Sequence, residues 1–100
     1  GEEWAKSLER QRAEAARELR AAIARGDPVE LRKAITNGQE AGLETGRGER
    51  AQRAPIMEQA HEALERAEAE IELEAELAEE RGRQDKRREA YERELQRLGL

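Results

Sequence analysis

Apolar residues recur every three or four positions through the first quarter of the chain, a spacing that places side chains on one face of an α-helix. That face comprises Trp4, Leu8, Ala15, Leu19, Ala22 and Ile23, with Gln11 as its polar member. The pattern predicts a helix over residues 2–25. It stops at Gly26-Asp27-Pro28, where glycine suits a C-terminal cap, aspartate an N-terminal cap and proline a first helical turn. A second helix is therefore expected from Pro28, antiparallel to the first.

The second helix has a clear start and an ambiguous end. Leu31, Ala34 and Ile35 form its apolar face, but the same face then becomes rich in glycine. In one interpretation the helix spans about 28–41 and residues 43–54 form a loop, because glycines occur at 38, 42, 46 and 48. In the other it spans 28–53, although each internal glycine costs about 1 kcal/mol relative to alanine. Helix-forming residues at 39–41 and 49–53 favour the longer helix.

Pro55 opens a further helix, again at a first-turn position. Its inner stripe is formed by Met57, His61, Leu64, Ile71 and Ala75. A break at Gly82, with Asp85 as the next cap, predicts helices over 55–81 and 85–98. Continuation through Gly82 predicts one long helix ending near residue 98.

Composition decides the fold class. The chain holds 18 Ala, 22 Glu, 16 Arg and 10 Leu, which is typical of long helices. Aromatic and β-branched residues are nearly absent, which excludes a sandwich or barrel. We predict an all-α fold: one domain over residues 1–100, forming a small antiparallel helical bundle of four helices, with three helices and a long C-terminal helix as the alternative. Half of the apolar residues are alanine, so the core is thin and the helices must lie close together.

Charge is distributed unevenly along the second half of the chain. Residues 58–80 hold ten acids and one base, whereas residues 81–100 hold four acids and seven bases. This asymmetry suits an antiparallel hairpin hinged at Gly82, and equally an antiparallel dimer of long helices. The net charge of −5 argues against nucleic acid and membrane surfaces as partners. No apolar run approaches the roughly 20 residues of a membrane span.

Several kinds of chemistry lack the residues they require. The chain has no cysteine, which excludes disulfides, thiolate catalysis and Cys-ligated metals. The one serine, Ser7, has no sequence reason to meet the one histidine, so no catalytic residue is predicted. No targeting signal is recognisable, which leaves localisation open and is consistent with cytoplasmic expression of a recombinant protein.

The segment Leu19–Ile35, with Arg25-Gly26-Asp27-Pro28 at its centre, resembles computationally designed (de novo) helical bundles. Such proteins favour Ala, Glu and Arg on their surfaces and use Gly-Asp-Pro as a helix–helix loop. The resemblance covers residues 1–35 and 62–98 and fails over 36–61. It implies a soluble, monomeric bundle without a natural biochemical role. A natural helical protein from a GC-rich genome shares the same compositional bias.

Residues 36–61, which resemble a designed bundle least, contain His61, the centre of the candidate site. Counting from the turns places His61 level with the glycine-rich segment and with the start of the first helix. A lone histidine opposite missing side chains predicts a pocket for a small planar ligand, and haem or another metalloporphyrin with His61 as the axial metal ligand fits it. The candidate residues are His61, Gly38, Gly42, Thr45, Gly46, Met57, Leu64, Trp4 and Leu8. We favour a histidine at a partly exposed bundle edge, beside a glycine-rich loop and with no cofactor; the pocket is the alternative.

Three functional hypotheses follow. The first is the designed bundle without a biochemical role, and the second is the haem- or ligand-binding bundle, whose chemistry would be oxidative or group transfer if it is an enzyme. The third is a helical interaction module that dimerises through a C-terminal apolar stripe. Its members are Leu73, Leu77, Tyr91, Leu95 and Leu98.

Overall fold

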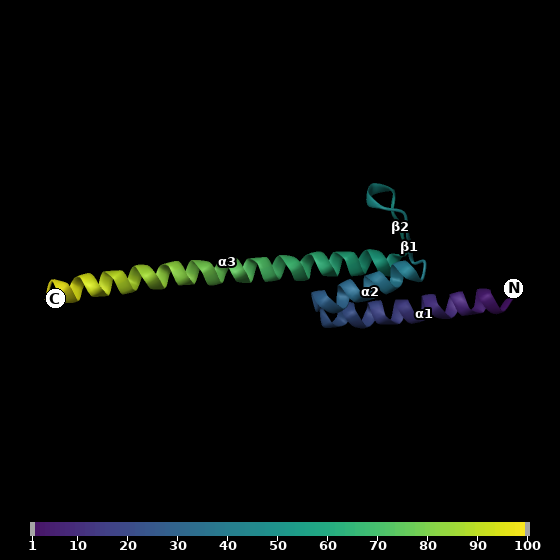
Figure 1. Ribbon diagram of the computed structural model, residues 1–100, viewed down its shortest axis with the longest axis horizontal. Coiled ribbons are helices and arrows are strands. Elements are labelled where there is room, and N and C mark those ends of the chain that lie inside the picture. Colours follow the sequence, from purple (N-terminus) through teal and green to yellow (C-terminus); the bar gives the residue numbers. More distant parts are fainter. Residues whose placement is uncertain (1, 100) are drawn as a thin grey trace. The chain divides into compact units, whose positions relative to one another are not determined.

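The computed structural model describes residues 2–99, which form three α-helices and one short β-hairpin (Figure 1). The helices are α1 (Glu2–Arg25), α2 (Pro28–Glu40) and α3 (Pro55–Arg97). The hairpin joins α2 to α3 and consists of β1 (Glu44–Thr45), the 3-10 helix η1 (Gly48–Arg50) and β2 (Gln52–Arg53). The all-α prediction is confirmed. The chain divides into two units between Glu68 and Ala69, which are described separately.

The turn between α1 and α2 forms as the sequence predicts. Gly26 has a φ of +70° and its amide donates to the Ala22 carbonyl at 2.9 Å, which ends α1. The Asp27 carboxylate accepts from the Val29 amide at 2.9 Å, and Pro28 is the first residue of α2. These caps satisfy backbone groups that the helix ends leave free, so the two helices reverse direction within two residues.

The core of the first unit is built mainly from small side chains. Leu19, Leu31 and Met57 are its largest fully buried members. The other buried members are Ala22 from α1, Ala34 and Ile35 from α2, and Ala60, Ala63 and Ala67 from α3. Small residues let helices pack closely, and at Gly38 the side chains of Met57 and Leu19 occupy the space that a Cβ atom would need. A Cβ atom added there would lie 2.6 Å from Met57 Sδ and 3.3 Å from Leu19 Cδ1.

Helix α2 ends at Glu40, so the favoured prediction of a helix over 28–53 is wrong, and the shorter alternative agrees to within one residue. Gly42 ends the helix because its φ of +87° is left-handed. Its amide donates to the Gln39 carbonyl at 3.1 Å, and the Leu43 amide donates to the Gly38 carbonyl at 2.9 Å. This pair of bonds is a Schellman cap. Arg12 of α1 adds a bond from Nε to the Ala41 carbonyl at 3.2 Å.

The segment after the cap returns to the bundle as a hairpin. Its two strands pair antiparallel, with Glu44 opposite Arg53 and Thr45 opposite Gln52. The Ala54 amide extends the ladder by donating to the Leu43 carbonyl at 2.9 Å. Gly46 and Gly48 also have positive φ, a conformation that a helix interior does not use. Pro55 then starts α3, as predicted.

Helix α3 is continuous from Pro55 to Arg97. The prediction of a four-helix bundle with separate helices over 55–81 and 85–98 is therefore wrong, and the alternative of three helices with a long C-terminal helix is confirmed. Gly82 costs the helix about 1 kcal/mol, but its neighbours are strong helix formers and an Arg83–Glu80 ion pair of 2.8 Å spans it. In the second unit, every described residue is exposed except Gly82 and Leu95, which are partly covered.

Candidate functional site

His61 contacts the β-hairpin through a buried carboxylate. Its Nε2 lies 3.0 Å from Glu44 Oε1, and the Glu44 side chain is only 5% exposed. The same carboxylate accepts hydrogen bonds from Gln39 at the end of α2 and from Arg53 of β2. We call Gln39, Glu44, Arg53 and His61 the Glu44 cluster. It joins α2, both strands and α3 at one point.

The surroundings of Glu44 favour its charged form. Burial alone would raise the pKa of this carboxyl group, because a low dielectric disfavours the anion. Hydrogen bonds from Gln39 and Arg53, with electrostatic interactions with His61 and Arg53, outweigh burial and hold the pKa below its ordinary value of 4.5. Arg53 also pairs with Glu58 of α3 at 3.3 Å, which extends the cluster by one more residue. The arrangement fastens the hairpin to the helices.

A metal centre at His61 needs further ligands close to the ring. Glu44 lies within reach of the ring nitrogen, but its carboxylate already serves three donors. Over residues 2–99, no group of three or more His, Asp or Glu side chains is placed to hold a metal ion. Metal or porphyrin binding at His61 stays a prediction.

The glycines of the predicted pocket have other roles in the structure. Gly38 is buried in the core, where the Met57 side chain fills the space beside it. Gly42 forms the cap of α2, and the Arg12 guanidinium lies over it. Gly46 lies in the exposed hairpin loop beside Thr45. The structure therefore brings Gly38 and Met57 together without leaving a slot between them.

The other predicted pocket residues are dispersed. Leu64 packs at the edge of the core, Leu8 is partly exposed on α1, and Trp4 is 71% exposed. His61 lies next to the strand that contains Thr45, but its contact is with Glu44. A pocket shared by the nine residues stays a prediction.

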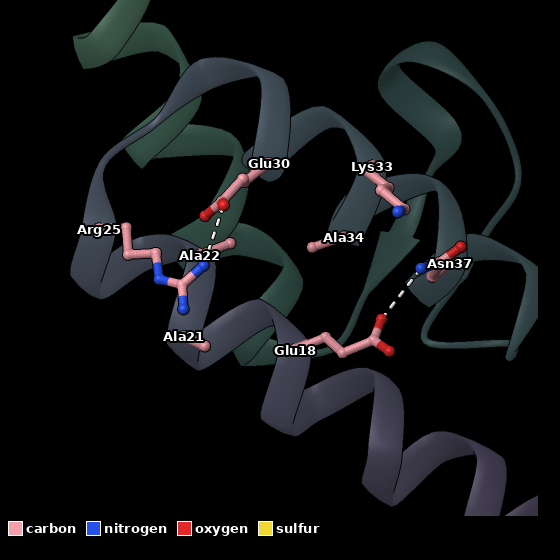
Figure 2. A pocket seen from close by; sticks show the side chains of 8 residues that line it. All are labelled: Glu18, Ala21, Ala22, Arg25, Glu30, Lys33, Ala34 and Asn37. Carbon is pink, nitrogen blue, oxygen red and sulfur yellow. Dashed lines mark hydrogen bonds and ion pairs between the residues drawn. The ribbon is translucent and has the colours of Figure 1, made fainter.

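Two shallow grooves follow the α1–α2 hairpin instead. The first, shown in Figure 2, has a volume of about 270 Å³ and an alanine floor formed by Ala21, Ala22 and Ala34. Its rim carries an Arg25–Glu30 ion pair of 2.9 Å and a hydrogen bond of 2.9 Å from Asn37 to Glu18. The second is lined by Gln11, Glu14, Ala15, Glu18, Asn37, Glu40 and Ala41. Neither groove includes any of the nine predicted site residues.

The C-terminal apolar stripe is the other candidate site, and it lies on α3 in the second unit. Leu73, Leu77, Tyr91 and Leu98 are between 48% and 65% exposed, and Leu95 is partly covered. Steps of 4, 14, 4 and 3 residues, at about 100° per residue, place the five within about 60° of one another around the helix axis. Leu98 directly follows the last residue of α3. Ile71 is also exposed, but it lies about 200° around the helix from Leu73 and so belongs to another side.

No protein-family model, curated protein or solved structure matches this chain. Among the described helices, none is both long and apolar enough to cross a membrane.

Sequence analysis missed the Glu44 cluster and the Arg12 contact. Glu44 and Arg53 are nine positions apart, and in a helix over residues 42–53 their side chains would not contact each other. A signal was present, since an acid and a base flank Gly46 and Gly48 at positions that pair across a hairpin. Opposite charges at facing strand positions favour that pairing. Nothing in the sequence marks Arg12 as the side chain that reaches the end of α2.

Proposed function

We propose that this chain is a self-associating helical module in which the C-terminal stripe of α3 pairs with the same stripe of a second copy. The observation that carries the proposal is the exposure of large apolar side chains along residues 69–98. The core of the first unit contains Leu19, Leu31, Met57 and alanines, and it contains none of the large apolar side chains of residues 69–98. Two groups of large apolar side chains, Leu73 with Leu77 and Tyr91 with Leu95 and Leu98, lie at the surface on one side of a helix, an arrangement typical of a site of interaction.

Helix energetics support the same conclusion. Most helical stability in proteins comes from packing of an apolar face. Residues 69–97 form helix with exposed side chains, supported locally by ion pairs such as Arg97–Glu94 at 2.6 Å and Arg93–Glu89 at 3.8 Å. Exposed pairs of this kind contribute about 0.3–0.5 kcal/mol each. Burying one leucine contributes about 1.5–3 kcal/mol, so pairing along the stripe is the larger source of stability.

Sedimentation velocity of the full chain across a wide concentration range tests the proposal. The wild-type mass should rise from monomer to dimer with concentration. The L73A/L77A variant should remain monomeric, because it loses the apolar groups at one end of the stripe. Ile71→Ala is the matched control: it removes a comparable exposed side chain from another side of α3 and should associate like the wild type.

Two results would contradict this function. One is a wild-type chain that stays monomeric at every concentration, as the resemblance to designed monomeric bundles predicts. The other is association of L73A/L77A as strong as that of the wild type, which would move the contact to another surface.

A further inference from the structure

Four members of the stripe, all except Leu98, belong to a seam whose spacing is the same in both directions. From Leu73 to Leu95 the positions on this side of α3 are separated by 4, 3, 4, 4, 3 and 4 residues. The seam consists of Leu73, Leu77, Glu80, Gln84, Arg88, Tyr91 and Leu95. Its midpoint is Gln84. When two such helices run antiparallel with their midpoints aligned, residues at equal distances from Gln84 face each other.

This alignment matches the chemistry of the facing residues. Leu73 faces Leu95 of the second copy, and Leu77 faces Tyr91, so apolar side chains meet apolar side chains. Glu80 faces Arg88, an acid against a base. A two-fold axis through Gln84 repeats each contact, which is the self-complementary arrangement of a symmetric dimer.

The charges beside the seam favour the same orientation. Residues 69–80 carry six glutamates and no base, whereas residues 81–97 carry seven bases and four acids. Because α3 continues through Gly82, its acidic half does not fold back on the basic half of the same helix. An antiparallel second copy places each acidic half against a basic half, which complementary potentials favour. Parallel pairing in register instead sets Glu80 against Glu80 and Arg88 against Arg88.

Building on the proposed self-association, we infer that two copies pair antiparallel through residues 69–97 of α3, with Gln84 at the two-fold axis and Glu80 bound to Arg88 of the second copy. In one chain, Glu80 contacts Arg83 at 2.8 Å and Gln84 at 3.5 Å on its own helix. A carboxylate has about four acceptor sites, so these contacts leave room for Arg88 of the second copy.

Single cysteines test the orientation, because the chain has none of its own. Under mild oxidation, Leu73→Cys alone and Leu95→Cys alone should give little disulfide dimer, since each cysteine faces a leucine. An equimolar mixture should give the mixed disulfide as the main product. The opposite pattern, with rapid disulfide formation by each variant alone and no preference for the mixed product, would establish a parallel dimer and overturn the inference.

Charge exchange tests the register and separates this inference from the proposed function. E80R and R88E should each weaken self-association by about tenfold, because like charges then meet twice in the dimer. The double variant E80R/R88E should recover most of the wild-type affinity. Wild-type dimers with no such recovery would overturn the Glu80–Arg88 register while leaving self-association intact. A monomeric wild type would overturn both.

Discussion

The two parts of α3 use similar residues for different purposes. Between Pro55 and Glu68, alanines at 60, 63 and 67 are buried against α1 and α2. Beyond Glu68, alanines at 69, 75, 78 and 90 are exposed, together with larger apolar residues. The larger side chains thus lie where this chain supplies no covering helix. Periodic spacing therefore shows which side of a helix is apolar, whereas the neighbours decide whether it is buried within one chain or between chains.

Truncating one leucine in each unit, Leu31 of α2 and Leu73 of α3, should distinguish the two regions most clearly. Leu31→Ala should destabilise the first unit by about 2–5 kcal/mol, because Leu31 is fully buried and its loss leaves a cavity. Leu73→Ala should leave the first unit unchanged at protein concentrations too low for association. Hydrogen exchange of the α2 amides measures both effects. Equal losses from the two substitutions would show that the stripe belongs to the core of the first unit.

The Glu44 cluster offers a smaller, local test. Glu44→Gln should reduce the stability of the hairpin by about 1–3 kcal/mol, since the new amide turns a donor toward the donors of Gln39 and Arg53. The Ala54 amide, which donates to the Leu43 carbonyl across the base of the hairpin, should exchange faster, and so should the Leu43 amide, which donates to the Gly38 carbonyl at the same point. Glu49→Gln, in the exposed η1, is the control and should leave both amides unchanged. Unchanged protection in Glu44→Gln would mean that the strands hold without the carboxylate.

The same carboxylate makes hairpin stability depend on pH. The folded pKa of Glu44 lies below the ordinary value of 4.5, so its contribution is complete above pH 4.5 and is lost as pH falls from 4.5 through the folded pKa. Protection factors of the hairpin amides should therefore fall in acid. Glu44→Gln should not show this fall, and a fall of equal size in that variant would assign the effect to another group.

Two glycines in helices should respond to alanine with opposite signs. At Gly38 the added methyl group meets Met57 and Leu19, and overpacking of about 1–3 kcal/mol exceeds the gain in helix propensity of about 1 kcal/mol. At Gly82 there is open space, so Gly82→Ala should stabilise the helix by about 0.5–1 kcal/mol. Thermal melting with hydrogen exchange distinguishes the regions. Stabilisation by Gly38→Ala would show that the core has room there.

Sequence alone predicted the elements whose ends are fixed by local chemistry. Asp27 and Pro28 cap the start of α2 wherever the rest of the chain lies, and Pro55 likewise opens α3. The end of α2 was harder, because residues 39–41 and 49–53 have helix-forming preferences that a glycine at positive φ overrides. Gly82 posed the opposite problem. A single glycine did not break the helix, since about 1 kcal/mol is small beside many well-formed helical turns.

The candidate sites depended on contacts that spacing does not encode. The pocket around His61 was predicted from a helix through residues 42–53, a segment that forms a hairpin in the structure, and the pocket stays a prediction. The neighbour of His61 is Glu44, one position before the predicted Thr45. The C-terminal stripe was recognisable because its members share one helix and one periodicity. Its exposure was not, because it follows from the absence of a break at Gly82.

The positions of the aromatic side chains determine which changes in this protein intrinsic fluorescence can detect. Trp4 and Tyr91 are its only aromatic residues of the Phe, Trp and Tyr type, and they are 71% and 65% exposed. Both rings already lie in water in the folded monomer, so loss of the core changes their surroundings little and intrinsic fluorescence hardly registers unfolding. Tyr91 lies on the stripe, and pairing with a second copy would remove its ring from water. Ultraviolet emission of this chain should therefore follow association more closely than folding.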